Sequence, residues 1–225
     1  MNKEEVFKAF VSFVENRWER VLLPLSAKYE WNGCDGDTTI EKRREWSREL
    51  NAAVSSSDKE KILDDFIRVW GRIYLRDKGR IGEFTDVKKT LNLVDKNKCV
   101  SSASKALSLW SPTEYFIYDS RVSIALHKMW GECKEVKNLK CPFVLCPSRS
   151  KKAKEFMALL KEVDKTRKVW AGRGYQKFYS EWYLKLIAEL RERCEKECPE
   201  KIEMALFVCG KCGESEGERL CCKKN

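Results

Sequence analysis

Histidine is nearly absent from this sequence, which contains a single one, His127. A catalytic triad that depends on histidine is therefore poorly supported, because a lone histidine in a helical segment is usually structural. The sequence also lacks a glycine-rich phosphate loop followed by Lys-Ser or Lys-Thr, so an NTPase of that class is not expected. No apolar run approaches the length of a transmembrane helix, and no membrane partner is predicted.

The first residues lack the small-residue cleavage site of a secretory signal peptide, and they carry Glu4, Glu5 and Glu15. This pattern indicates an amphipathic helix of the folded protein. A cytoplasmic protein is expected. Without a secretory signal, the eleven cysteines do not predict a disulfide framework.

The hydrophobic pattern is almost entirely helical. Apolar residues make up 43 % of the 225 residues and recur at intervals of three and four along most of the chain. Residues 31–39 and 134–147 are predicted to be loops, while residues 116–118 and 204–208 look like strands too short to build a sheet. The sequence predicts an all-α fold of about eight helices, with one helical domain over residues 1–193 and a short cysteine-rich tail over 194–225.

The positive charge is concentrated in one segment. The net charge of the chain is +10, and residues 128–177 contain fourteen Lys and Arg against five Asp and Glu. A basic field of this kind attracts polyanions, among which nucleic acid is the first candidate. The alternative is a solvated lysine-rich face. On composition alone we expect a nucleic-acid partner.

The stretch SSASKALSLWSPTEYFIYDSRVSIAL, residues 101–126, holds the most specific pattern. Serines at 101, 102 and 104 can cap a helix, which predicts Lys105 in the first helical turn. A cation is disfavoured there, so helix stability does not explain the lysine. Asp119 follows the apolar residues 116–118 and is a natural N-cap for the next helix. The pair is either a reaction centre, with a lysine nucleophile and an electrostatic carboxylate, or two surface charges at helix starts.

The segment SASKALSLWSPTEYFIYDSRVSIAL resembles the stretch that carries the chemistry in helix–hairpin–helix DNA glycosylases. It is most similar to bacterial proteins with the 8-oxoguanine DNA glycosylase fold. In that superfamily a lysine opens the second helix of the hairpin and an aspartate caps a later helix, which implies Lys105 and Asp119 here. The family's Gly-apolar-Gly turn, which donates N–H groups to a DNA phosphate, is replaced by KCVSSAS. This difference indicates a divergent branch.

The resemblance implies a DNA glycosylase, with or without lyase activity, that excises a damaged or modified base from double-stranded DNA. Lys105 would attack C1′ of a flipped-out nucleotide while Asp119 stabilises the developing oxocarbenium charge. No cofactor is required, and a monomer is expected. The setting could be base excision repair or defence against modified phage DNA. The alternative is a non-catalytic DNA-binding protein that retains the fold.

Further residues could contact the DNA or the flipped base. Tyr175 and Gln176 lie in a stretch that mixes aromatic and basic residues, and they are candidates for the base pocket. Phosphate contacts are predicted from helix starts and from the basic segment. The candidate DNA contacts are Ser102, Ser104, Arg121, Arg149, Lys151, Lys152 and Arg173.

The cysteine-rich tail could hold a metal. The segment from Cys209 to Cys212 has the Cys-x-x-Cys spacing of a metal knuckle, in which two thiolates face an ion across a tight turn. A second pair of ligands for a structural zinc could come from Cys194 and Cys198 or from Cys221 and Cys222. As in some members of the superfamily, Cys198 and Cys221 could instead join the knuckle in holding an iron–sulfur cluster. The alternative is a reduced, metal-free tail.

Overall fold

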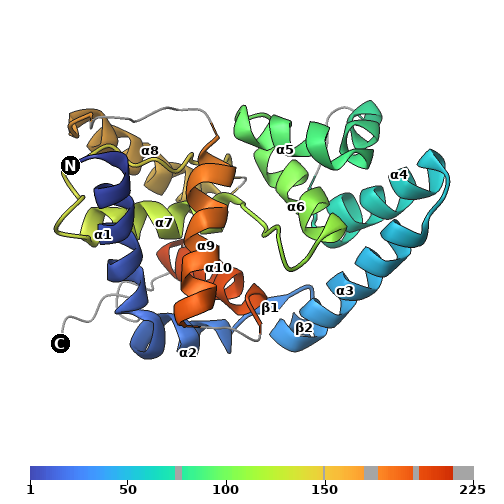
Figure 1. Ribbon diagram of the computed structural model, residues 1–225, viewed down its shortest axis with the longest axis horizontal. Helices are drawn as coiled ribbons and strands as arrows, with labels where there is room; N and C mark the ends of the chain where they lie inside the picture. Colours follow the sequence, from blue (N-terminus) through green and yellow to red (C-terminus); the bar gives the residue numbers. More distant parts are fainter. Residues whose placement is uncertain (74–77, 149, 170–176, 195–197, 215–225) are drawn as a thin grey trace. The chain divides into compact units, whose positions relative to one another are not determined.

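The computed structural model describes residues 1–73, 78–148, 150–169, 177–194 and 198–214 (Figure 1). The chain forms two compact units. The terminal unit joins Met1–Tyr29 to Ser120–Asn225, and the inserted unit is Glu30–Asp119. The sequence predicted a boundary at residue 193. The structure divides the chain at residues 30 and 120, and the described part of the predicted tail, residues 194 and 198–214, belongs to the terminal unit.

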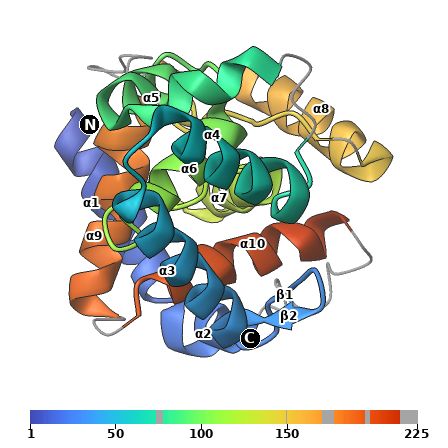
Figure 2. The same cartoon turned by 90° about the vertical axis from the view of Figure 1, so that its right-hand side faces the viewer.

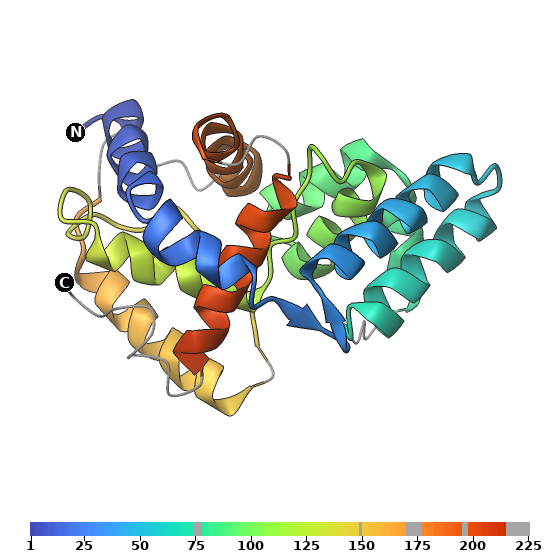
Figure 3. The same cartoon turned by 90° about the horizontal axis from the view of Figure 1, so that it is seen from below.

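The inserted unit begins with a short β-hairpin. Strand β1 (Glu30–Trp31) pairs antiparallel with β2 (Cys34–Asp35), and Figure 3 shows the hairpin leading into the first long helix of the unit. Asn32 and Gly33 form the turn with φ angles of 53° and 73°. An Asn-Gly pair favours this left-handed conformation, which a type I′ turn requires. The hairpin replaces the loop that the sequence predicted here.

The rest of the inserted unit is helical. Three helix starts are capped by carboxylate or hydroxyl oxygens of the preceding residue, Asp35, Ser55 or Asp86, which accept a backbone N–H. Phe66 stacks on Trp70 with ring centroids 4.7 Å apart, and Trp46 packs edge-on against both rings. The elements are α3 (Gly36–Ala52), α4 (Ser56–Asp64), the π-helical η2 (Asp65–Trp70), the 3₁₀-helical η3 (Lys78–Thr85), α5 (Val87–Asp95) and α6 (Val100–Trp110).

Helices α5 and α6 pack against each other as a helical hairpin. The turn between them places Asn97 at φ 59° and Cys99 at φ 49°. Two left-handed residues separated by one position reverse the chain without any glycine. Asparagine tolerates this conformation better than most residues, whereas a cysteine there is uncommon. The chain therefore forms a tight helical hairpin at NKC, just before the stretch that carries Lys105.

The terminal unit is also helical, with an aromatic core. Phe10, Trp130, Phe143 and Trp182 pack with ring centroids 5.0 to 6.4 Å apart. Helix α10 packs against α7 and α2 (Figure 2), and α1 packs against α9. The elements are α1 (Lys3–Glu15), η1 (Trp18–Leu22), α2 (Leu23–Ser26), α7 (Ser120–Glu132), α8 (Lys151–Thr166), η4 (Tyr179–Tyr183), α9 (Leu184–Arg193) and α10 (Glu200–Glu214).

The structure confirms the all-α class and corrects the two segments that looked like strands. Residues 116–118 belong to an irregular connection, and residues 204–208 lie within α10. Five consecutive apolar residues suit a helix that is buried on several sides as well as a strand, and residues 204–208 are all buried. Within the described residues, no helix is both long and apolar enough to cross a bilayer.

Candidate active site

Lys105 lies inside α6 rather than at its start. The helix begins at Val100, and Cys99 occupies the N-cap position with no side-chain cap hydrogen bond. The prediction that a serine caps the helix and places Lys105 in the first turn is therefore wrong. The left-handed turn at Asn97 and Cys99 starts the helix before the serines are reached. Lys105 is 4 % exposed, so it is not a surface charge.

The stem of Lys105 packs against Gly71, the residue that follows η2. A methyl group added at Gly71 would lie 3.0 Å from Lys105 Cδ and 2.6 Å from the Ile67 carbonyl oxygen. The neighbouring Trp70 carbonyl accepts hydrogen bonds from Trp31 Nε1 at 2.9 Å and from Asn32 Nδ2 at 2.6 Å. These bonds tie the β-hairpin to the end of η2, and they fix the backbone against which the lysine stem lies.

Replacing Gly71 by alanine should destabilise the protein because the new methyl group has no room. We expect a loss of about 1–3 kcal/mol in the free energy of unfolding, the usual cost of overpacking a filled site. Urea denaturation followed by circular dichroism measures this loss. Gly82→Ala is the matched control, because a methyl there meets only the end of the Glu60 side chain, at 3.2 Å. Equal stability of the two variants would contradict this packing.

A hydrogen-bonded clamp joins α6 to the connection that precedes Asp119. The Tyr118 backbone N–H donates to Ser104 Oγ at 3.0 Å. The Ser104 hydroxyl lies 3.2 Å from the Tyr118 carbonyl oxygen and 3.3 Å from that of Ser101. Ser104 and Tyr118 are fully buried. They precede Lys105 and Asp119 by one residue each, so the clamp brings the backbones that carry the two candidate catalytic residues together.

Asp119 ends the inserted unit and immediately precedes α7. It is half-buried, and it follows three buried residues, 116–118, in the irregular connection. The pKa of the nearby Tyr115 phenol is raised by partial burial and by the charge of Glu114. The phenol therefore stays neutral at physiological pH. The site thus combines a buried lysine and a half-buried aspartate on segments that the Ser104 clamp holds together.

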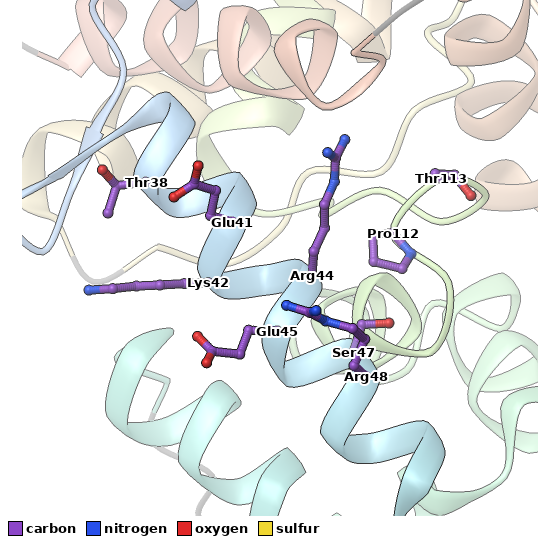
Figure 4. Close-up of a pocket in the computed structure, with 9 residues that line it drawn as sticks. All are labelled: Thr38, Glu41, Lys42, Arg44, Glu45, Ser47, Arg48, Pro112 and Thr113. Atoms are coloured by element: carbon purple, nitrogen blue, oxygen red, sulfur yellow. The ribbon is translucent and has the colours of Figure 1, made fainter.

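An open groove lies on the inserted unit beside the connection from α6 to Asp119. Its volume is about 830 Å³, and Figure 4 shows that most of its lining comes from α3. Sequence reasoning missed this feature, although the run EKRREWSRE in α3 is strongly charged. The groove lining carries charges of both signs, with three cations and two anions. Its lining residues are Thr38, Glu41, Lys42, Arg44, Glu45, Ser47, Arg48, Pro112 and Thr113.

The residues predicted to contact DNA differ in how exposed their side chains are. The side chains of Ser102, 5 % exposed, and Ser104, 0 % exposed, are buried, and the Ser104 hydroxyl bonds within the protein instead of facing a phosphate. The Arg121 guanidinium lies 4.6 Å from the centre of the Phe207 ring. Lys151 is highly exposed at the start of α8, where the Ser150 hydroxyl caps the helix by accepting the Ala153 N–H.

The remaining candidates are only partly covered by the structure. Lys152 lies in the first turn of α8, but its side chain is not described. Four other residues of the prediction lie outside the described residues: Arg149, Arg173, Tyr175 and Gln176.

The predicted metal knuckle does not form a tight turn. Cys209 and Cys212 lie in α10, and Cys209 is buried. Helical packing explains this, because a methyl group added at Gly210 would lie 1.9 Å from the Arg121 carbonyl oxygen, so the helix rests directly on the backbone of α7. Cys198 is half-buried, and Cys221 lies outside the described residues, as does the side chain of Cys212. The part of the chain that is described contains no group of three or more His, Cys, Asp or Glu placed to hold a metal.

No protein-family profile, curated protein or solved structure matches the chain.

Proposed function

We propose that the protein is a DNA glycosylase with lyase activity, a divergent member of the helix–hairpin–helix superfamily. The observation that carries the proposal is the buried Lys105, which follows Ser104 in α6, while Ser104 bonds to Tyr118, the residue before Asp119. The helical hairpin of α5 and α6 directly before this site supports it. Burying a lysine costs free energy, so a lysine inside a folded unit is a candidate functional group.

The chemistry needs only these two side chains. The neutral amine of Lys105 attacks C1′, a C–N bond forms, and the bond from C1′ to the base breaks. The base leaves with that electron pair and takes up a proton. Asp119 stabilises the positive charge that develops on the sugar.

A Schiff base follows from the same adduct. The nitrogen loses a proton and then expels the ring oxygen O4′, which is protonated, so that a protonated Schiff base remains at C1′. Loss of a C2′ proton then allows the 3′ phosphate to leave with its bonding pair and cleaves the strand. The route requires no metal or cofactor. We expect a monomer that acts in the cytoplasm, in base excision repair or in defence against modified phage DNA.

The charge distribution supports a DNA partner. The inserted unit contains sixteen Lys and Arg and sixteen Asp and Glu, whereas the terminal unit contains twenty-nine and nineteen. All the net positive charge therefore lies in the terminal unit, while Lys105 and Asp119 lie in the inserted one. We propose that the terminal unit supplies most of the phosphate contacts and that the inserted unit supplies the chemistry.

Reversing two charges on α8 should weaken DNA binding and reduce its salt dependence. In the variant Lys151→Glu/Lys154→Glu, each lost phosphate contact should lower the slope of log K against log salt by about 0.9. Fluorescence anisotropy with a duplex at several salt concentrations measures the slope. The control is Lys28→Glu/Lys61→Glu, which changes the net charge equally at exposed sites outside residues 128–177. Indistinguishable slopes for the two variants would contradict the proposal that α8 contacts DNA phosphates.

Borohydride reduction separates this function from the alternative. A protein that forms a Schiff base with DNA becomes covalently attached on reduction, whereas a non-catalytic DNA-binding protein does not. Attachment to a duplex that carries a modified base supports the glycosylase. Tight, salt-dependent binding with no attachment and no base release on any duplex would favour the non-catalytic alternative.

A further inference from the structure

We infer that Ser104 is a positioning residue for the reaction, an inference that rests on the proposed function. Its hydroxyl accepts the Tyr118 N–H at 3.0 Å and lies 3.2 Å from the Tyr118 carbonyl oxygen. Both polar backbone groups of one residue thus meet a single side chain fourteen positions away. Ser104 does not touch the reacting atoms. It acts by fixing where Asp119 sits relative to Lys105.

The position of Asp119 needs such a constraint. Residues 115–119 form neither helix nor strand, so no regular ladder of backbone hydrogen bonds sets their register. Burial of Phe116 and Ile117 anchors the connection in the core of the unit. Hydrogen bonds are directional, and the clamp holds the residue immediately before Asp119 against the residue immediately before Lys105. One serine can therefore fix the register between the two segments.

Ser108 lies in the same helix but does not bond to Tyr118. Ser108 is equally buried and lies one turn later, but its hydroxyl donates to the Lys105 carbonyl oxygen at 2.8 Å, within the same helix. It makes a local helix bond of a common kind. Ser108→Ala is therefore a matched control for Ser104→Ala, because it removes the same atom from the same helix at the same burial and leaves Tyr118 bonded.

The test separates the chemical step from DNA binding. Single-turnover base release is measured with saturating full-length protein on the modified duplex that the wild type processes fastest, and duplex affinity is measured by anisotropy. Misplacement of a reacting group by about 1 Å costs about a hundredfold in rate. We expect Ser104→Ala to lower the single-turnover rate by about tenfold to a hundredfold, with affinity unchanged within about twofold. Ser108→Ala should stay within about twofold of wild type in both.

Circular dichroism establishes that each variant is folded. If Ser104→Ala does not fold, Ser104→Cys decides the matter, because it nearly keeps the volume of the side chain and has only a weak hydrogen-bonding group. Its rate should also fall while affinity holds. A folded Ser104 variant with the wild-type rate would overturn the inference, as would an equal loss in Ser108→Ala. If the wild type releases no base from any duplex, the proposed function fails and this inference fails with it. If the wild type is active and Ser104→Ala is equally active, only the role of Ser104 fails.

Discussion

Lys105→Met should abolish both base release and covalent trapping while the protein stays folded. Methionine keeps an unbranched apolar stem that can pack against Gly71 in place of the lysine stem, so the buried site stays filled. Only the amine is removed, and without it no Schiff base can form. Gel assays of base release and of borohydride-trapped complexes measure the loss, and we expect neither product above background.

Lys89→Met is the matched control for this variant. Lys89 is exposed on α5, in the same unit, so the substitution changes the same charge outside the buried site. It should keep the wild-type rate of base release. A folded Lys105→Met variant that still trapped DNA would show that another amine carries the chemistry.

Asp119→Asn should lower the rate of base release by about two to three orders of magnitude, the usual cost of deleting one electrostatic stabiliser of the transition state. Asparagine caps helices about as well as aspartate, so the start of α7 should be retained. The variant should bind duplex DNA like the wild type and differ from it in the single-turnover rate. In the proposed mechanism, the substitution removes the negative charge that stabilises the oxocarbenium ion.

Glu114→Gln is the control for Asp119→Asn, because Glu114 is an exposed carboxylate in the same connection. It should leave the rate unchanged. Full activity of a folded Asp119→Asn variant on a proven substrate would remove Asp119 from the mechanism. Unfolding of that variant would instead assign it a structural role.

The sequence predicted the helical class, but it placed Lys105 incorrectly within its helix. Periodicity reports which residues share a face, and it does so well for long amphipathic helices. A helix start also depends on the backbone conformation of the residues before it. Here the two left-handed positions are Asn97 and Cys99, so no glycine marks the turn in the sequence. The serines after them are good capping residues, so the sequence pattern favours a helix start at the serines, whereas the structure begins α6 at Val100.

The contacts that support the site could not be predicted from local patterns. The bond between Ser104 and Tyr118 and the packing of Lys105 on Gly71 both join segments distant in sequence. Only the assembled fold reveals such pairs. The β-hairpin at Asn32 and Gly33 is different, because an Asn-Gly pair is itself a signal for this turn.

The division into two units could not be predicted from composition either. Residues 198–214 look like part of a cysteine-rich tail because their glycines and cysteines suggest a metal turn. In the structure residues 200–214 form α10, which packs on α7 and α2 with a continuous buried stretch over residues 202–210. A helix that is buried on most sides has weak amphipathic periodicity. The sequence pattern therefore does not identify this segment as a helix of the core.

Borohydride trapping of the wild-type protein tests the central claim most directly. The substrates are duplexes that each carry one modified base, such as 8-oxoguanine, uracil, hypoxanthine or 5-hydroxymethylcytosine, beside an unmodified duplex as control. We predict a covalent complex with at least one modified duplex, and mass spectrometry of its proteolytic peptides should locate the attached sugar on Lys105. Attachment at a different residue, or no attachment to any duplex under conditions in which the protein binds DNA, would contradict the account.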